Sequence, residues 1–424
     1  MISLKKIREN KELINRGLLA KNFDTSQIDL ILEKDLSWRT GVAEVEKLKE
    51  ERNSASKEVS ILKKEGKPSE TIIEKMQSVS LRIKELDTLN SKVKDQIDDL
   101  ILAIPNIPHH SVPLGKDETS NIVVREWGKK TEFEFPILRH AEIAQKLNLL
   151  DFRAGSLISG AGFPVYIGLG AKLERSLINF MLDTHVENGY KETFPPFMVN
   201  RKSMETTGQL PKFYDDMYEL PKDELFAIPT AEVPVTNYYR DQIVDEEALP
   251  IKFAAYSACF RREAGSYGKD TKGLLRLHQF NKVELVKFSN PKTSYDELEL
   301  ILKDAEKILQ ILGLHYRVIE LCTGDLSFSA SKCYDIEVWS PFEEKYLEVS
   351  SCSNFEGFQS YRGNMRFRSS ETGKMEFLHT LNGSGLATPR LMVALLENFQ
   401  NKDGTLSVPD SLKQYMGIDS ISND

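Results

Sequence analysis

The sequence has only four cysteines (Cys259, Cys322, Cys333 and Cys352), and no two of them form a CxxC pair. This spacing is typical of reduced thiols and argues against a disulfide framework or a zinc site. The chain also lacks a run of about 20 apolar residues, which a membrane-spanning helix would need. Its first residues, MISLKKIREN, lack the apolar core of a signal peptide and the composition of a transit peptide. We therefore expect a cytoplasmic protein with no membrane partner.

The chain also has fewer basic residues than acidic residues. The 56 Lys and Arg residues are outnumbered by 64 Asp and Glu residues, which gives a net charge of −8. Because phosphate contacts need positive charge, this balance argues against DNA as a partner and leaves RNA binding to a local basic surface. Neither GxxxxGK[ST] nor GxGxxG occurs, which argues against a P-loop or a Rossmann nucleotide site. At 424 residues, the chain is long enough for two domains.

Two heptad patterns run through the first hundred residues. Their seam positions are Trp38, Gly41, Val45, Leu48, Arg52, Ala55, Val59 and Leu62, then Met76, Val79, Ile83, Leu86, Asn90, Val93, Ile97, Leu100 and Ile104. Gly66 and Pro68 break the helix between them. The pattern predicts one antiparallel helical hairpin with arms of about 40 residues, or about 55–60 Å. The polar seam residues Arg52 and Asn90 are typical of register control.

The outer faces of this hairpin carry mixed Lys and Glu, the usual composition of a solvated face. A long hairpin with an exposed tip also suits a protein that grasps a long ligand. The side chains that could then contact phosphates are Arg39, Lys47, Lys49, Arg52, Lys57, Lys63 and Lys64.

Three prolines, Pro105, Pro108 and Pro113, stop the helix and indicate a linker over residues 105–120. Beyond it, residues 121–424 mix helices with short strands. The expected helices are Gly168–His185, Asp296–Leu312 and a final one at Pro389–Phe399. The expected strands are Leu225–Ile228, Phe253–Phe260, Leu277–Val286, Tyr334–Trp339 and Tyr346–Ser350. The fold class is therefore α+β, with the helical hairpin (residues 1–104) followed by an antiparallel β-sheet flanked by helices.

A basic, glycine-containing segment lies between two of the expected strands. From Arg261 to Lys287 we count seven Lys and Arg against three Asp and Glu, in an otherwise acidic chain. An arginine at a strand end, followed by a loop of Gly and Lys, suits a polyphosphate ligand. Phe280 could stack on a base or belong to the core.

A second segment, LNGSGLATPRLMVALLEN, places Arg390 at the start of a helix. A cation there opposes the helix dipole, so a bound anion explains it better than helix stability does. The alternative is an ordinary surface arginine.

Taken together, these segments resemble the class II aminoacyl-tRNA synthetases. FRRE, with Phe280 and Glu284 downstream, resembles motif 2, and NGSGLATPR resembles motif 3. The helix that runs into Phe194-Pro195-Pro196 resembles motif 1, the dimer-forming element. IPTAEVPVTN, EVSSCSN and the N-terminal hairpin narrow the resemblance to the seryl-tRNA synthetases over essentially the whole chain. Ala387 departs from the glycine series of motif 3, but it is still a small residue.

The resemblance implies a serine–tRNA ligase and a class II catalytic domain over residues 121–424. With ATP and Mg²⁺ such an enzyme converts L-serine to seryl-adenylate and pyrophosphate, and it then transfers serine to the 3′-terminal adenosine of tRNA(Ser). The resemblance also implies a homodimer whose hairpin embraces the long variable arm of the tRNA, and it allows tRNA(Sec) as a second substrate.

The resemblance also implies site residues. Arg261 would hold the α-phosphate and the serine carboxylate, Glu263 the adenine side and Arg390 the γ-phosphate, and these three form the catalytic set. The implied ATP-binding residues are Arg261, Arg262, Glu263, Phe280, Glu348, Val349, Ser350, Ser351 and Arg390. The implied serine-binding residues are Thr230, Ala231, Glu232, Arg261, Glu284 and Ser384. Glu348 and Ser351 would hold Mg²⁺.

Two other functions compete with this interpretation. A related ligase that loads an amino acid onto a carrier protein would lack the hairpin, so the heptads argue against it. A coiled-coil RNA-binding protein with an inactive catalytic domain would have no need for Arg261, Glu263, Glu284, Glu348 and Arg390 together.

Overall fold

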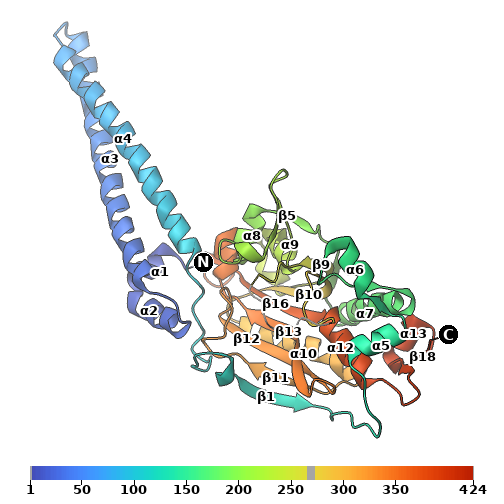
Figure 1. Cartoon of the computed structure of the whole chain (residues 1–424). Coiled ribbons are helices and arrows are strands. Elements are labelled where there is room, and N and C mark those ends of the chain that lie inside the picture. The colour runs from blue at the N-terminus through green and yellow to red at the C-terminus, as the bar shows by residue number, and fades with distance from the viewer. Residues whose placement is uncertain (1, 265–272, 424) are drawn as a thin grey trace. The chain divides into compact units, whose positions relative to one another are not determined.

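The computed structural model of the chain describes residues 2–264 and 273–423 (Figure 1). They form two compact units. One consists of residues 2–19 and 23–104, and the other of residues 20–22 and the chain from residue 105 onward. Among the helices of the described residues, none has an apolar stretch that could cross a bilayer.

The N-terminal unit is a long helix pair preceded by two short helices. Helices α3 (Ser26–Lys64) and α4 (Glu70–Leu102) lie side by side, as Figure 1 shows, and this confirms the predicted hairpin. The arms have 39 and 33 residues, so the second is shorter than the predicted length of about 40 residues. Helices α1 (Leu4–Glu9) and α2 (Lys11–Ala20) were not predicted by the heptads.

The seam between α3 and α4 follows the predicted heptads. Val45, Ile83 and Leu86 are buried against one another, and the other predicted seam positions are buried or partly buried. A Cβ atom at Gly41 would lie 2.1 Å from Oδ1 of Asn90, so the absence of a side chain at Gly41 makes room for the Asn90 amide. Asn90 thus has one matching position on the other helix, which supports its role in setting the register.

The second unit is built on an eight-stranded sheet. Its order is β1–β11–β12–β13–β16–β10–β9–β4, and every pair is antiparallel except β4–β9. The bounds are β1 (Ile122–Trp127), β11 (Tyr316–Glu320), β12 (Lys332–Ser340), β13 (Lys345–Asn354), β16 (His379–Ala387), β10 (Gln279–Ser289), β9 (Ile251–Phe260) and β4 (Lys191–Thr193). The predicted antiparallel sheet is confirmed, and β9, β10, β12 and β13 overlap predicted strands. The predicted strand Leu225–Ile228 belongs to a separate small sheet.

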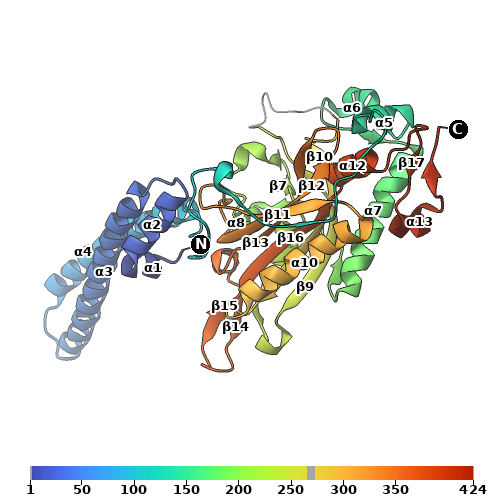
Figure 2. The ribbon, with the colours of Figure 1, turned by 90° about the horizontal axis from the view of Figure 1, so that it is seen from below.

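Three of the long helices pack on this sheet. They are α7 (Gly168–Glu187), α10 (Ser294–Leu312) and α12 (Thr388–Asn398), close to the predicted ranges. Figure 2 shows α7 and α10 running across one face of the sheet. Helix α10 ends at Gly313, whose φ of 72° suits glycine. The prediction that α12 is the final helix is wrong, since α13 (Asp410–Met416) follows it.

The alternation of side chains along β10 separates the core from the opposite face. Val283 and Leu285 belong to the main hydrophobic core, together with residues of α7 and α10. Lys282 and Glu284 therefore point to the other face of the sheet. That face carries the candidate site.

The other α-helices and strands are short. The helices are α5 (His140–Lys146), α6 (Phe152–Ser159), α8 (Arg201–Thr207), α9 (Glu232–Thr236) and α11 (Phe358–Gly363). Two small sheets have two strands each: β2 (Leu150–Asp151) with β3 (Val165–Tyr166), and β17 (Leu406–Ser407) with β18 (Ser420–Ile421). Two have three strands each: β5 (Met198–Asn200), β6 (Tyr218–Leu220) and β7 (Leu225–Ala227) form one, and β8 (Ile243–Val244), β14 (Arg366–Arg368) and β15 (Met375–Phe377) form the other.

Candidate active site

A cavity of about 640 Å³ opens on this face of the sheet, between β9, β10, β13, β16 and the start of α12. Its volume suits a nucleotide with a small second ligand. The structure brings most of the predicted site residues into its lining, namely Thr230, Glu232, Arg261, Glu263, Phe280, Glu348, Val349, Ser351, Ser384 and Arg390.

Four predicted site residues are not part of the lining. Glu284 is fully buried directly behind it, and Ala231 is also fully buried. The Ser350 hydroxyl donates a hydrogen bond to the Ser384 carbonyl (2.6 Å), so Ser350 supports the wall from behind. Arg262 is exposed, and its guanidinium lies 5.7 Å from the centre of the Tyr218 ring.

One end of the cavity has a compact acidic network. The Asn382 amide nitrogen donates to Glu232 Oε2 (3.1 Å) and to Glu284 Oε1 (2.8 Å), so it bridges the two carboxylates. Gln359 donates to the other oxygen of Glu232 (2.6 Å). Antiparallel pairing of β10 with β16 places Glu284 directly opposite Ser384. These groups could together bind an ammonium group and a hydroxyl group.

A buried lysine balances part of this negative charge. Lys282 lies two residues before Glu284, and its Nζ is 2.5 Å from Glu284 Oε2 and 2.9 Å from Thr230 Oγ1. The Thr230 hydroxyl donates in turn to Glu284 (3.1 Å). Since a buried charge is costly without a partner, Lys282 and Glu284 each supply the opposite charge that the other needs.

Glu232 has the most perturbed carboxyl group of the network. Burial and the negative charge of Glu284 raise its pKa to about 7, although Gln359, Lys282 and Arg261 act in the opposite direction. An incoming ammonium group would supply the positive charge that this carboxylate lacks.

Two arginines stand apart from the acidic end. The Arg261 guanidinium lies 5.2 Å from the centre of the Phe280 ring, at the adjoining ends of β9 and β10. Arg390, near the start of α12, donates to the Glu348 carbonyl (2.8 Å) and lies 3.4 Å from the Glu348 carboxylate. Two cations and a helix N-terminus at one cavity form a suitable site for a polyphosphate.

Glu263 lines the cavity beyond Arg261. Its φ of 51° is in the left-handed region, and Arg276 donates to its Oε2 (3.0 Å). The backbone around it is held by Asp216, whose carboxylate accepts from the Ala264 N–H (2.8 Å). Gly265 and Gly268 of the predicted glycine-containing loop lie outside the described residues.

The predicted Mg²⁺ ligands, Glu348 and Ser351, both face the cavity. Burial and the charge of Glu348 raise the pKa of the neighbouring Asp335, which means that negative charge is in excess here. One carboxylate and one hydroxyl beside a phosphate site match the way in which Mg²⁺ is usually bound, with phosphates and waters completing the shell. The residues present therefore fit this ion.

Sequence reasoning missed several residues of the site. Lys282, Arg276 and Asn382 line the cavity, and Gln359 is the buried partner of Glu232. Lys282 could have been identified from the two-residue period of its strand, which puts it on the same face as Glu284. Asn382 could have been identified in the same way from Ser384. No strand pattern or neighbouring site residue indicates Gln359, because it reaches the site from a separate helix, α11.

Two family models match the chain. Residues 1–108 match the seryl-tRNA synthetase N-terminal domain, and residues 214–399 match the tRNA synthetase class II core domain (G, H, P, S and T). The second match includes most of the cavity lining.

Individual relatives match over the full length. The chain is 57% identical over 422 residues to the serine–tRNA ligase of Caldicellulosiruptor saccharolyticus, covering 99% of this chain and 100% of the relative. It is 54% identical over 428 residues to that of Chloroherpeton thalassium, with 99% and 100% covered. The chain belongs to the seryl-tRNA synthetase family. The predictions of a class II aminoacyl-tRNA synthetase and of a serine–tRNA ligase are thereby confirmed.

A solved structure of the family has the same fold throughout. The crystal structure of the seryl-tRNA synthetase from Pyrococcus horikoshii complexed with ATP has a TM-score of 0.94 and 37% identity, and 100% of each chain is covered. That protein binds ATP, which supports the ATP-binding prediction for this chain. Family membership also favours the ligase over both alternative functions considered from the sequence.

Proposed function

We propose that this seryl-tRNA synthetase activates serine in the described cavity, with the amino acid at the acidic end and ATP along the two arginines. The observation that carries the proposal is the Glu232–Asn382–Glu284 network in one cavity with Arg261 and Arg390. The acidic end suits an ammonium and a hydroxyl group, and the arginines suit a carboxylate and phosphates.

The chemistry needs positioning more than it needs a protein nucleophile. The serine carboxylate attacks the α-phosphorus, the bond to the β-phosphate breaks, and pyrophosphate leaves in line. Arg261 neutralises charge on the reacting carboxylate and α-phosphate, and Arg390 neutralises charge on the leaving pyrophosphate. Phe280 stacks on the adenine ring, and Glu263 contacts its amino group. The ribose hydroxyl of the terminal tRNA adenosine then attacks the seryl carbonyl, and AMP leaves.

Glu348 and Ser351 would hold Mg²⁺ against the phosphates. When bound, the ion adds positive charge that stabilises the transition state. Glu348 also contacts Arg390, so the carboxylate orients that arginine at the same time.

Serine is recognised by its hydroxyl group in this proposal. An ionised Glu284 only accepts, whereas the Ser384 hydroxyl both donates and accepts. A substrate hydroxyl can therefore donate to Glu284 and accept from Ser384, while Glu232 takes the ammonium. Alanine would leave Glu284 and the Ser384 hydroxyl without the partner that the serine hydroxyl supplies.

The test is serine-dependent exchange of pyrophosphate into ATP, followed by tRNA(Ser) charging. We expect exchange with serine and little with alanine. Ser384→Ala removes one hydrogen bond to the substrate hydroxyl and should lower the serine-to-alanine preference by about 5- to 150-fold. Ser353→Ala is a matched control, because it changes another buried serine of the lining. An unchanged preference in Ser384→Ala would show that the hydroxyl is read elsewhere.

The raised pKa of Glu232 predicts a pH dependence of serine capture. Only the ionised carboxylate attracts the ammonium, so kcat/KM for serine should rise with pH up to about 7 and then level off. Glu232→Gln should be slower and should lose this inflection. The measurement is the exchange rate at limiting serine and saturating ATP, between about pH 5.5 and about pH 8.5. The same inflection in Glu232→Gln would assign it to another group.

We further propose that the helical hairpin grips tRNA(Ser), that tRNA(Sec) is an additional substrate where one is present, and that the enzyme works as a cytoplasmic homodimer. Exposed apolar side chains support a second copy as the partner. Leu157 and Ile158 on α6 are 79% and 74% exposed, and Phe194, after α7, is 73% exposed. Neighbouring exposed apolar side chains, such as Leu157 and Ile158, provide apolar surface that a partner could cover.

A further inference from the structure

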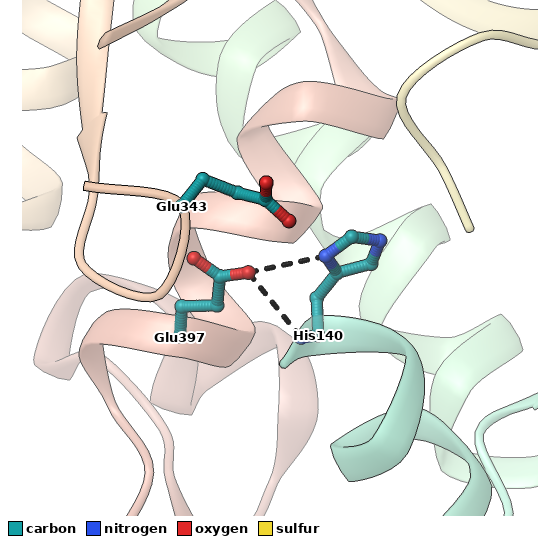
Figure 3. A group of neighbouring side chains, drawn as sticks. All are labelled: His140, Glu343 and Glu397. Carbon is teal, nitrogen blue, oxygen red and sulfur yellow. Dashed lines mark hydrogen bonds and ion pairs between the residues drawn. The ribbon is translucent and has the colours of Figure 1, made fainter. Parts of the chain in front are cut away.

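A buried cluster outside the cavity joins three segments that are distant in sequence. His140 begins α5, Glu397 lies near the end of α12, and Glu343 follows β12 (Figure 3). Their ligand atoms lie within 4.8 Å of one another, a spacing that a metal ion would accept. His140 and Glu397 are both fully buried.

The hydrogen bonds of this cluster show that it is not a cation site. Glu397 Oε1 accepts from the His140 backbone N–H (3.3 Å) and lies 3.1 Å from His140 Nδ1, as Figure 3 shows. Glu397 Oε2 accepts from the Ser340 hydroxyl (2.5 Å). Glu343 is paired with Arg139, at 2.7 Å. The oxygen atoms that a cation would need are already engaged, and a guanidinium occupies the neighbourhood.

The other ring nitrogen of His140, Nε2, makes a hydrogen bond to a different segment. His140 Nε2 accepts a hydrogen bond from the Leu274 backbone N–H (3.3 Å). Because a backbone N–H can only donate, Nε2 carries no proton, and Nδ1 donates to Glu397. Glu397 thus fixes the tautomer and the orientation of the ring, and the ring fixes the backbone at Leu274.

The Gly273–Leu274 backbone is fitted closely to this ring. A Cβ atom at Gly273 would lie 2.1 Å from Nε2 of His140, and the φ of Gly273 is +70°. The next four residues, Leu274 to Leu277, line the cavity, and Arg276 among them holds Glu263. A shift at Leu274 would therefore reach the end of the cavity where Glu263 lies.

We propose that His140 is a positioning residue for ATP: held by Glu397, it fixes the Leu274 backbone and with it the Arg276–Glu263 pair on the adenine side of the cavity. This inference rests on the proposed function, which places adenine beside Glu263. His140 itself touches no substrate, and the activation chemistry does not use it.

Two substitutions of His140 separate its two hydrogen bonds. The amide of glutamine reaches the position of Nε2 and can still accept from Leu274, whereas the amide of asparagine reaches only the position of Nδ1 and can still donate to Glu397. We expect His140→Asn to raise the KM for ATP in pyrophosphate exchange by about 10-fold or more, with the KM for serine changed less than about 2-fold. His140→Gln should stay within about 3-fold of the parent for both substrates.

The dissociation constant for ATP, measured by calorimetry, should follow the same order, and this keeps the test independent of serine activation. If the parent showed no serine-dependent exchange but the order held for ATP binding, the proposed function would fail and the role of His140 would stand. Equal weakening by both variants, or an unchanged ATP constant in a folded His140→Asn, would overturn the proposal. If His140→Asn does not fold, Gly273→Ala displaces the same backbone and should raise the KM for ATP selectively; equal KM changes for ATP and serine would overturn the proposal.

Discussion

Replacing Arg390 with alanine is expected to lower serine-dependent pyrophosphate exchange by about 10²–10³-fold, and replacing Arg261 with alanine should do the same. Arg390 stands at the N-terminus of α12, where the helix dipole already favours an anion, and its guanidinium is oriented by the hydrogen bond that it donates to the Glu348 carbonyl. The guanidinium therefore meets the leaving pyrophosphate without much reorganisation.

Arg261 lies elsewhere in the cavity, and its loss should lower pyrophosphate exchange to the same extent. It lies next to Phe280 and lines the cavity between the acidic end and the start of α12. There it can neutralise charge on both reacting groups, the carboxylate and the α-phosphate. Since this charge develops in the transition state, we expect the loss in Arg261→Ala mainly in kcat.

Arg317→Ala is a matched control for both variants. Arg317 is 31% exposed, close to the 30% of Arg390, and it is also paired with a glutamate, Glu337. It lies on β11, outside the cavity lining. The control should keep near-parental exchange, and all three variants should keep a parental thermal unfolding transition. Near-normal exchange in either Arg261→Ala or Arg390→Ala would refute its assignment to the phosphates.

The helical hairpin was predictable because its signal is local and repeated. Each seam residue sits in a heptad, so the pattern needs no knowledge of the rest of the chain. The end of the second arm is less visible in the sequence, because the heptads run to Ile104 and the helix ends at Leu102. The contact of Gly41 with Asn90 depends on the register between two helices, and only the structure gives this register.

The candidate site was predictable in part for a different reason. Arg261, Glu263, Glu284 and Arg390 lie in segments that resemble known motifs, and the structure gathers them at one cavity. Gln359 lies outside these segments and reaches Glu232 from a separate helix, so its role depends on tertiary packing. The hydrogen bond between His140 and Glu397 was missed because the two residues are 257 positions apart in the sequence.

Shortening the hairpin is expected to abolish efficient tRNA charging and to leave serine activation nearly unchanged. Gly41 and Asn90 face each other across the seam, so removing residues 42–89 and joining the ends by a short Gly/Ser turn keeps the base of the hairpin. The base retains buried Ile28, Ile31 and Ile97. The cavity lining begins at Gln209, far from the removed segment in sequence, so pyrophosphate exchange should stay within about 3-fold of the parent.

Charging should fall by at least about 100-fold, because the removed segment carries all the candidate phosphate contacts of the hairpin except Arg39. Lys47, Lys57, Lys63 and Lys64 are exposed on α3 and are all removed. A helical surface reads RNA mainly through its shape and backbone, so the loss should appear as a raised KM for tRNA that depends less steeply on salt than the KM of the parent. The measurement is aminoacylation of tRNA(Ser) over a range of tRNA and salt concentrations, with pyrophosphate exchange on the same sample as the control. A shortened enzyme that charges tRNA as well as the parent would show that the hairpin is not the tRNA grip, and the catalytic domain alone would then have to select the tRNA.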